Sequence, residues 1–236
     1  MFYAISPLVL CMVYYGCRDA EWRPWSVFVG VHVVGLLCAA VFYGWSVIPI
    51  LLGPWTLPFL SWAGFRKSYE LFRHFHRNQL NVCLHGLFYP MRACGVFLLF
   101  SQLSELIWGT SEWWLRLDVW YLLGWVLLFI KISAPLWIRF ASIGVVTALF
   151  LLADLLRQSG AWDADDPKWN SPVMPWALFI VGGMLQGLSH LLTKEEPAML
   201  DYNSLEAKLA HQTLLPPFLI LAVKEAISEA RGKYPP

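Results

Sequence analysis

The stretch SPVMPWALFIVGGMLQGLSHLLT, residues 171–193, decides the class of fold, because it contains no Asp, Glu, Lys or Arg. A helix of about 20 mostly apolar residues is long enough to cross the hydrocarbon core of a bilayer. Pro24–Phe65 is another long stretch without these charged residues. Lipid cannot satisfy exposed backbone groups, so only helices or closed barrels cross it. Because the apolar runs are continuous rather than alternating with polar residues, they favour helices.

The composition of the whole chain supports a membrane protein. Of 236 residues, 58% are hydrophobic and only 14% are charged, whereas a soluble domain carries roughly 25% charged residues. Many of the 14 tryptophans lie near the ends of the apolar runs, as in the aromatic belts of membrane proteins. The net charge of +1 argues against a nucleic-acid partner. Five cysteines without a CxxC pair are predicted to be free, buried thiols: Cys11, Cys17, Cys38, Cys83 and Cys94.

We therefore predict an all-α, polytopic membrane bundle of about six to eight apolar helices. The segment Met1–Cys17 is followed, not preceded, by the positive charge of Arg18, so we expect a retained first helix rather than a signal peptide. Two segments, Arg66–Asn81 and Lys194–Gln212, are polar, and the first is predicted to be amphipathic. The predicted apolar helices are Phe2–Tyr15, Trp25–Trp45, Ser46–Trp62, Leu84–Trp108, Leu117–Ile132, Pro135–Leu156, Val173–Leu192 and Leu214–Ala226.

The distribution of Lys and Arg predicts the orientation of the bundle, because short cytosolic loops are enriched in these residues. Alternate threading of the predicted helices brings three basic connections to one side, which we assign to the cytosol. These connections contain Arg66, Lys67, Arg73 and Arg77, then Lys131 and Arg139, then Lys194 and Lys208. The acidic loop 161–170 falls on the other side. The same threading places His74, His76, His85, His190 and His211 at the cytosolic end, whereas His32 does not join them.

Histidines gathered at one membrane level are candidate metal ligands, since neutral imidazole binds metals and ionisable groups in membrane helices are usually functional. The alternative for a histidine near a helix end is interfacial hydrogen bonding, which we keep for His32. On one straight helix His76 and His85 would face opposite sides, with about 13 Å of rise between them. Joint ligation therefore requires a break near Gln79–Asn81. Gln186 lies one turn before His190 on the same face and can orient its ring or a neighbouring ring.

The spacing of these residues resembles two signatures of a family of small multi-span membrane proteins. The first is His76-x-Asn78-x-x-Asn81-x-x-x-His85, which leads into a run with Pro90; the second is Gln186-x-x-x-His190, followed by Lys194-Glu-Glu-Pro197-Ala198. His211 ahead of Leu-Leu-Pro-Pro-Phe is a third, weaker match. The characterised yeast member of this family is an iron(II)-dependent 2-hydroxy-fatty-acid dioxygenase of the endoplasmic reticulum. It acts in fatty acid α-oxidation during phytosphingosine breakdown.

The resemblance covers roughly Phe65 to Glu225 and divides the chain into three parts. Residues 1–65 are expected to be an N-terminal extension with two or three membrane helices, residues 66–228 a histidine-motif dioxygenase-like membrane domain, and residues 229–236 a polar tail. Two positions depart from the family pattern. Ser189 replaces a glycine before the second-signature histidine, and the acidic residue common three or four positions after that histidine is absent, since Thr193 and Lys194 stand there and Glu195 comes later.

The resemblance also implies roles for individual residues. The expected metal ligands are His76, His85, His190 and His211, with Asn78, Asn81 and Gln186 orienting them, and His74 is expected not to ligate. Arg77 or Arg92 is expected to pair with the substrate carboxylate through its bidentate guanidinium. A site of two histidines and one carboxylate is the alternative ligand set. Its candidate carboxylates are Glu70, Glu195, Glu196 and Asp201.

The function implied by the resemblance is the oxidative shortening of 2-hydroxy fatty acids by one carbon, with Fe(II) as cofactor and dioxygen as co-substrate. The substrate tail would lie in the lipid and its carboxylate at the cytosolic membrane face. The expected membrane is the endoplasmic reticulum, although another organelle or a bacterial inner membrane has the same hydropathy. Two alternatives remain open: a catalytically silent relative that serves as a structural subunit of a larger membrane complex, and a transporter or haem-binding membrane protein.

Overall fold

The computed structural model describes residues 25–43, 47–57, 64–108, 112–158, 173–196 and 205–230. These residues form helices and short connections and include no strand, which confirms the prediction of an all-α fold. Several sequence predictions lie outside the described residues. They concern the helix Phe2–Tyr15, the thiols of Cys11 and Cys17, the acidic loop 161–170, Asp201 and most of the polar tail.

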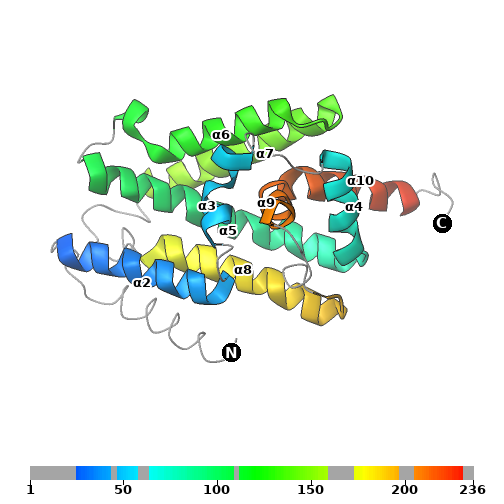
Figure 1. The fold of residues 1–236 in the computed structure, drawn as a ribbon, viewed down its shortest axis with the longest axis horizontal. Helices are drawn as coiled ribbons and strands as arrows, with labels where there is room; N and C mark the ends of the chain where they lie inside the picture. Colours follow the sequence, from blue (N-terminus) through cyan, green and yellow to red (C-terminus); the bar gives the residue numbers. More distant parts are fainter. Residues whose placement is uncertain are drawn as a thin grey trace. The chain divides into compact units, whose positions relative to one another are not determined.

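Most of the described helices follow the predicted apolar segments closely (Figure 1). The helix α5 begins at Gln79 rather than at Leu84, and so takes in the end of the segment Arg66–Asn81 that was predicted to be amphipathic. The polar segment Lys194–Gln212 also contains a short helix, α9, in its second half. The helices are α2 (Trp25–Tyr43), α3 (Val47–Thr56), α4 (Phe65–Phe75), α5 (Gln79–Trp108), α6 (Leu117–Lys131), α7 (Leu136–Gln158), α8 (Val173–Thr193), α9 (Leu205–Thr213) and α10 (Leu215–Ala230), with a 3-10 turn, η3, at Trp113–Leu115.

Three helical segments within the described part are long and apolar enough to cross a membrane. They are Gln79–Glu105, Leu136–Gln158 and Val173–Thr193, and Val29–Val41 is a shorter apolar segment. A membrane protein is therefore supported, whereas the larger number of six to eight apolar helices stays a prediction. Of the cysteines, Cys38 and Cys94 are free and buried as predicted; Cys83 is free but exposed, because it lies on the outward face of α5.

The amphipathic helix α4 ends just before the first histidine signature. Its buried side chains follow helical spacing, namely Phe65, Tyr69, Phe72 and Phe75. His76 leaves the helical conformation with φ −132° and ψ 59°, and the side chain of Asn78 accepts a hydrogen bond from the Leu80 N–H at 2.9 Å. An Asn at this position caps a new helix. The break required by the two histidines thus lies at His76–Asn78, slightly before the predicted Gln79–Asn81.

Contacts between the helices define two units that do not follow chain order. The first comprises Met1–Val47, Met91–Tyr121 and Leu149–Gly182, and the second comprises Ile48–Pro90, Leu122–Ala148 and Gly183–Pro236. Each of α5, α6, α7 and α8 contributes residues to both units. The predicted division between residues 65 and 66 cuts the chain once, whereas each of these units combines several segments of the chain. That division stays a prediction.

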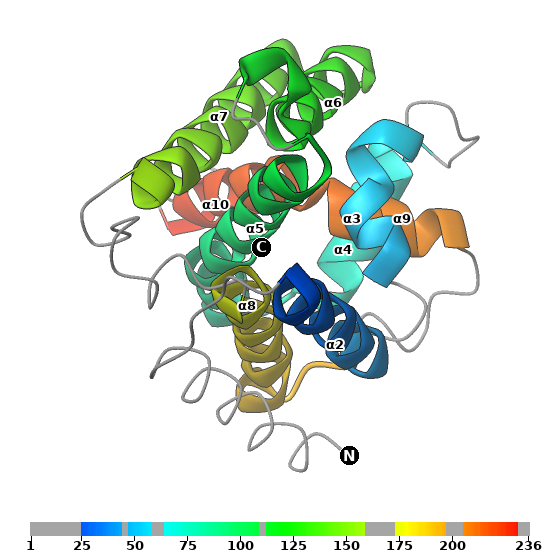
Figure 2. The same cartoon turned by 90° about the vertical axis from the view of Figure 1, so that its left-hand side faces the viewer.

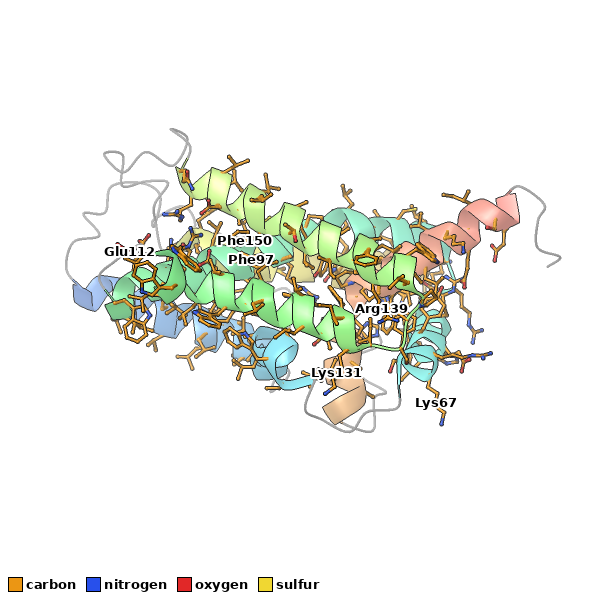
Figure 3. The ribbon with its side chains drawn as sticks, turned by 90° about the horizontal axis from the view of Figure 1, so that it is seen from above. Lys67, Phe97, Glu112, Lys131, Arg139 and Phe150 are labelled. Atoms are coloured by element: carbon orange, nitrogen blue, oxygen red, sulfur yellow. The ribbon has the colours of Figure 1, made fainter. Side chains whose placement is uncertain are left out.

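In the first unit, α2 packs against the beginning of α8 (Figure 1), where the Trp176 Nε1–H donates to His32 Nδ1 at 2.9 Å. His32 thus has the hydrogen-bonding role expected for it. Phe97 of α5 and Phe150 of α7 meet edge to face with ring centroids 5.6 Å apart (Figure 3). At the same end of the unit, Arg116 pairs with Asp118 and Asp154 and so joins the start of α6 to the end of α7.

In the second unit, α4 packs against α9 and α10, and these two helices also contact each other (Figures 1 and 2). The ring of Phe218 on α10 lies against Phe65, Tyr69 and Phe72 of α4. The Tyr69 hydroxyl donates to Glu225 Oε2 at 2.7 Å. Burial and this carboxylate raise the pKa of Tyr69, so the phenol stays protonated and holds α4 to α10.

The turn between α6 and α7 is closed by a single arginine. Arg139 donates to the carbonyl oxygens of Ala134 at 2.9 Å and Ile130 at 3.0 Å, so its side chain lies back across the turn (Figure 3). Carbonyls at the end of a helix have no partner within that helix, and a cationic side chain stabilises them. Arg139 therefore fixes the geometry with which the apolar helix α7 begins.

Gly95 on α5 tests the close packing of α5 and α8 in the first unit. A Cβ at Gly95 would lie 2.6 Å from the Phe179 nitrogen and 2.7 Å from the Pro175 oxygen. Because these are backbone atoms, we expect Gly95→Ala to destabilise the fold by about 1–3 kcal/mol, measured as a lower midpoint of thermal unfolding in detergent.

Gly144 on α7 is the matched control, because a Cβ there would meet nothing within 4 Å. Gly144→Ala should leave the midpoint unchanged or raise it, since alanine is about 1 kcal/mol more favourable than glycine inside a helix. Equal midpoints for the two variants would contradict the close approach at Gly95.

Candidate metal centre

Three of the four histidines predicted as metal ligands come together in the second unit. His76 follows α4, His85 lies near the start of α5, and His190 lies in the last turn of α8. Each ring offers a nitrogen, and these nitrogens all lie within 4.8 Å of one another. The three side chains are at most 5% exposed. A buried group of three imidazoles at this spacing can hold a metal ion.

Two of the rings present their lone pairs to each other. His76 Nδ1 lies 2.9 Å from the Phe72 carbonyl oxygen, and His85 Nδ1 lies 3.1 Å from the Asn81 carbonyl oxygen. A carbonyl oxygen only accepts, so both Nδ1 atoms carry the hydrogen and both Nε2 atoms carry a lone pair.

The two Nε2 atoms of His76 and His85 are 3.3 Å apart. Without a cation or a proton between them, the two lone pairs would repel. Two nitrogens bound to one metal at about 2.1 Å, with bond angles of a tetrahedral or octahedral site, lie roughly 3.0–3.4 Å apart. The donor set and its spacing therefore fit a metal ion held by these two rings.

His76 is kept neutral and fixed in place by its surroundings. The ring of Phe72 stacks on it with centroids 4.1 Å apart, and Arg73 donates to its backbone oxygen at 2.8 Å. Burial and the neighbouring His190 lower the pKa of His76 to about 3. A neutral imidazole is the form that binds metals, so His76 is available as a ligand at neutral pH.

Asn81 connects the histidines through its side-chain amide. Its oxygen accepts from the Ser189 hydroxyl at 2.6 Å, and its nitrogen donates to Glu195 Oε2 at 2.6 Å and to His190 Nδ1 at 3.3 Å. The Ser189 oxygen also lies 3.0 Å from His85 Nδ1. One buried amide and one hydroxyl thus orient two of the three imidazoles, as residues behind metal ligands commonly do.

Glu195 anchors this network at the beginning of α5. Its Oε1 accepts from the backbone N–H groups of Arg77 at 2.6 Å and Asn78 at 2.7 Å. A carboxylate is favoured at a helix N-terminus, where backbone donors have no other partner. Because the carboxylate only accepts, the Asn81 nitrogen must face it, which fixes the direction of that amide.

The direction of the Asn81 amide has a consequence for His190. His190 Nδ1 accepts from Asn81, so the neutral ring carries its hydrogen on Nε2 and presents a donor. His190 would bind a metal ion through Nε2 only with its hydrogen on Nδ1, and that form would give up the hydrogen bond from Asn81. In this geometry His76 and His85 would hold a metal ion through Nε2, and His190 would be a third ligand or a donor to another ligand of the ion.

His211, the fourth predicted ligand, lies beside the three histidines. It is 6% exposed, and its ring is 5.4 Å from the His76 ring at an angle of 30°. His211 is not part of the described group whose nitrogens lie within 4.8 Å of one another. The ring of His211 therefore packs on the ring of His76, and its role as a fourth ligand stays a prediction.

The hydrogen bonds described for the other polar residues in and around the first signature do not involve the three histidine rings. Asn78 caps α5, and its side chain serves the helix start. Arg77 is exposed and donates through its guanidinium to His74 Nδ1 at 2.9 Å, and His74 is exposed, in keeping with its expected exclusion from the ligand set. Arg92 is buried and belongs to the first unit, whereas the three histidines belong to the second.

Of the alternative carboxylate ligands, Glu195 is the one that reaches the histidines, through Asn81. Glu70 is exposed and pairs with Arg66 on the same helix. Glu196 is exposed, and Asp201 lies outside the described residues. Sequence reasoning assigned no role to Ser189 or Phe72. The four-residue spacing of Phe72 and His76 could have indicated their contact, whereas no local pattern indicates the contact between Ser189 and Asn81.

No protein-family model, no curated protein sequence and no solved structure matches this chain. The geometry of the histidines and the pattern of the sequence are therefore the observations that support a function.

Replacing His85 tests the metal centre directly. We expect the purified chain to bind one Co(II) or Fe(II) ion, and His85→Ala to lose at least about 100-fold in affinity, since a ligand contributes more than an orienting residue does. Metal titration in detergent, followed by the visible absorption of Co(II), measures this. His74→Ala is the control, because His74 is exposed and bonded to Arg77. Equal affinities for His85→Ala and wild type would rule out His85 as a ligand.

Replacing Asn81 tests the orienting network. Asn81→Leu keeps the approximate volume but removes the contacts with Ser189, Glu195 and His190. Because orienting residues typically contribute 10- to 100-fold to metal affinity, we expect a loss of about that size. Cys83→Ala on the same helix is the control, since Cys83 is exposed. Unchanged metal affinity in Asn81→Leu would show that the network does not support the metal.

Proposed function

We propose that this chain is an iron(II)-dependent dioxygenase that oxidatively shortens 2-hydroxy fatty acids by one carbon. The observation that carries the proposal is the buried group of His76, His85 and His190 at the ends of apolar helices. The order and spacing of the histidine signatures, which resemble those of the dioxygenase family, support the same function.

Iron(II) suits this donor set because imidazole nitrogen is a common ligand of iron. His76 and His85 would hold the ion through Nε2, with His190 beside it. When bound, the metal would supply a template for the substrate and dioxygen and a source of electrons. The contribution of the chain is to keep the ring nitrogens neutral, oriented and shielded from water, and the hydrogen bonds to Phe72 and Asn81 serve that purpose.

The position of the histidines along the helices suits an amphiphilic substrate. His85 lies near the start of the apolar segment Gln79–Glu105, and His190 lies near the end of Val173–Thr193. A fatty acid in a bilayer places its carboxylate at the membrane surface and its tail among the lipid chains. We assign this surface to the cytosolic face, because Arg66, Lys67, Arg73 and Arg77 precede the site. The endoplasmic reticulum is the membrane proposed.

The proposed reaction balances with one dioxygen for each acid. The bond between C1 and C2 breaks, C2 becomes the carboxyl carbon of the shortened acid, and C1 leaves as carbon dioxide. The substrate supplies all the electrons that reduce dioxygen, and one water forms. The reaction therefore needs no external reductant, which distinguishes it from hydroxylation.

An oxygen-uptake assay tests the proposal. The chain is loaded anaerobically with Fe(II) in detergent, and a long-chain 2-hydroxy fatty acid and dioxygen are added. We expect one dioxygen consumed for each shortened acid formed, and a loss of at least about 100-fold in His85→Ala, because the metal supplies the chemistry. The fatty acid without the 2-hydroxyl is the substrate control, and His74→Ala is the protein control.

Full iron occupancy without turnover would contradict the enzymatic proposal. The chain would then fit the alternative of a catalytically silent structural subunit, and stable copurification with other membrane chains would be the corresponding observation.

A further inference from the structure

The side chain of Gln186 is buried on α8, one helical turn before His190 of the candidate metal centre. Gln186 is 5% exposed, and its Nε2 has no hydrogen-bond partner among the described residues. Buried side-chain donors in folded proteins are almost always paired, because an unpaired one forfeits its bond to water without replacement. The unpaired Nε2–H of Gln186 would have an acceptor if a molecule bound at the neighbouring site supplied one.

The position of Gln186 on α8 places it beside the histidines. It precedes His190 by one turn on the same face, and helical side chains lean toward the N-terminus, so the His190 ring leans toward the turn of Gln186. The backbone carbonyl oxygen of Gln186 lies 2.6 Å from the Ser189 hydroxyl oxygen, which also lies 3.0 Å from His85 Nδ1.

Several other donors near the centre contact protein groups, whereas His190 Nε2 presents a donor as Gln186 does. Arg73 donates to the His76 oxygen and pairs with Glu225. Arg77 donates to His74, and the Asn81 nitrogen donates to Glu195 and His190. The Thr213 hydroxyl also lacks a partner among the described residues, but it lies against Gly53 of α3.

A 2-hydroxy acid bound to the metal would need a hydrogen-bond donor, just as the Gln186 Nε2–H needs an acceptor. It would bind the metal through its hydroxyl and one carboxylate oxygen, which closes a five-membered ring. The second carboxylate oxygen then remains a buried acceptor without a donor. A neutral amide satisfies this oxygen without adding charge, and the metal balances the negative charge of the acid.

We propose that the Gln186 Nε2–H donates to the carboxylate oxygen of the substrate that the metal does not bind. This inference rests on the proposed function and names the residue that recognises the acid headgroup. Gln186 then takes the role that the sequence predicted for Arg77 or Arg92. It is a specificity residue that selects an acid over an alcohol of the same chain length.

The test compares two ligands on the Co(II)-loaded protein without dioxygen. The first is a long-chain 2-hydroxy fatty acid, and the second is the 1,2-diol of the same length, which lacks the second carboxylate oxygen. Binding is followed by the change in the Co(II) spectrum. Gln186→Leu should bind Co(II) as wild type does, because Gln186 Nε2 donates to no histidine among the described residues and so lacks the orienting role predicted for it. Its Kd for the acid should rise about 10- to 100-fold, as expected for loss of a buried hydrogen bond to a charged group. Its Kd for the diol should stay unchanged.

Gln186→Glu provides a second variant that keeps a polar side chain, so the proposal remains testable if the leucine variant does not fold. Its carboxylate would repel the acid, and it should weaken acid binding more than diol binding. Gln79→Leu is the control, because Gln79 is exposed and contacts Glu229.

An unchanged Kd for the acid in Gln186→Leu, or an equal loss for the acid and the diol, would overturn the role of Gln186 while leaving the proposed function intact. Failure of the wild-type chain to bind Co(II) or the acid would overturn the proposed function and this inference together.

Discussion

The candidate site depends on one constraint: two buried, neutral imidazoles whose Nε2 atoms face each other at 3.3 Å. Backbone carbonyls of Phe72 and Asn81 hold the hydrogen of each ring on Nδ1. This leaves two lone pairs directed at one point, which is favourable with a cation between them and costly without one. The break between α4 and α5, the capping of α5 by Asn78 and the packing of Phe72 on His76 all serve to create this approach.

The fold was largely predictable from the sequence, because apolar runs and helical spacing are local properties. The bounds of α7 and α8 lie close to those of the predicted apolar runs Pro135–Leu156 and Val173–Leu192. The break before α5 was predicted from the chemistry of His76 and His85, and its position was wrong by a few residues. The reason is that Asn78 caps α5, since its side chain accepts a hydrogen bond from the Leu80 N–H.

The grouping of His76, His85 and His190 and the presence of Asn81 beside them were predictable, whereas the other partners of Asn81 were not. His76, His85 and His190 come together as expected, because signatures and threading both placed them at one membrane level. Asn81 binds the carboxylate of Glu195 and the hydroxyl of Ser189. Ser189 and Glu195, which lie where the sequence departs from the resembled pattern, thus both contact the side-chain amide of Asn81. Such long-range contacts depend on the packing of α5 and α8 and leave no periodic signal in the sequence.

The most direct measurement of the central claim is the X-ray absorption spectrum of iron in the Fe(II)-loaded chain in detergent. A site made by His76 and His85, with His190 beside them, predicts about one iron per chain and a shell of two or three imidazole nitrogens at about 2.1 Å. The outer scattering of imidazole rings should decrease in His85→Ala. A chain without bound iron, or a shell of oxygen ligands alone, would contradict the account.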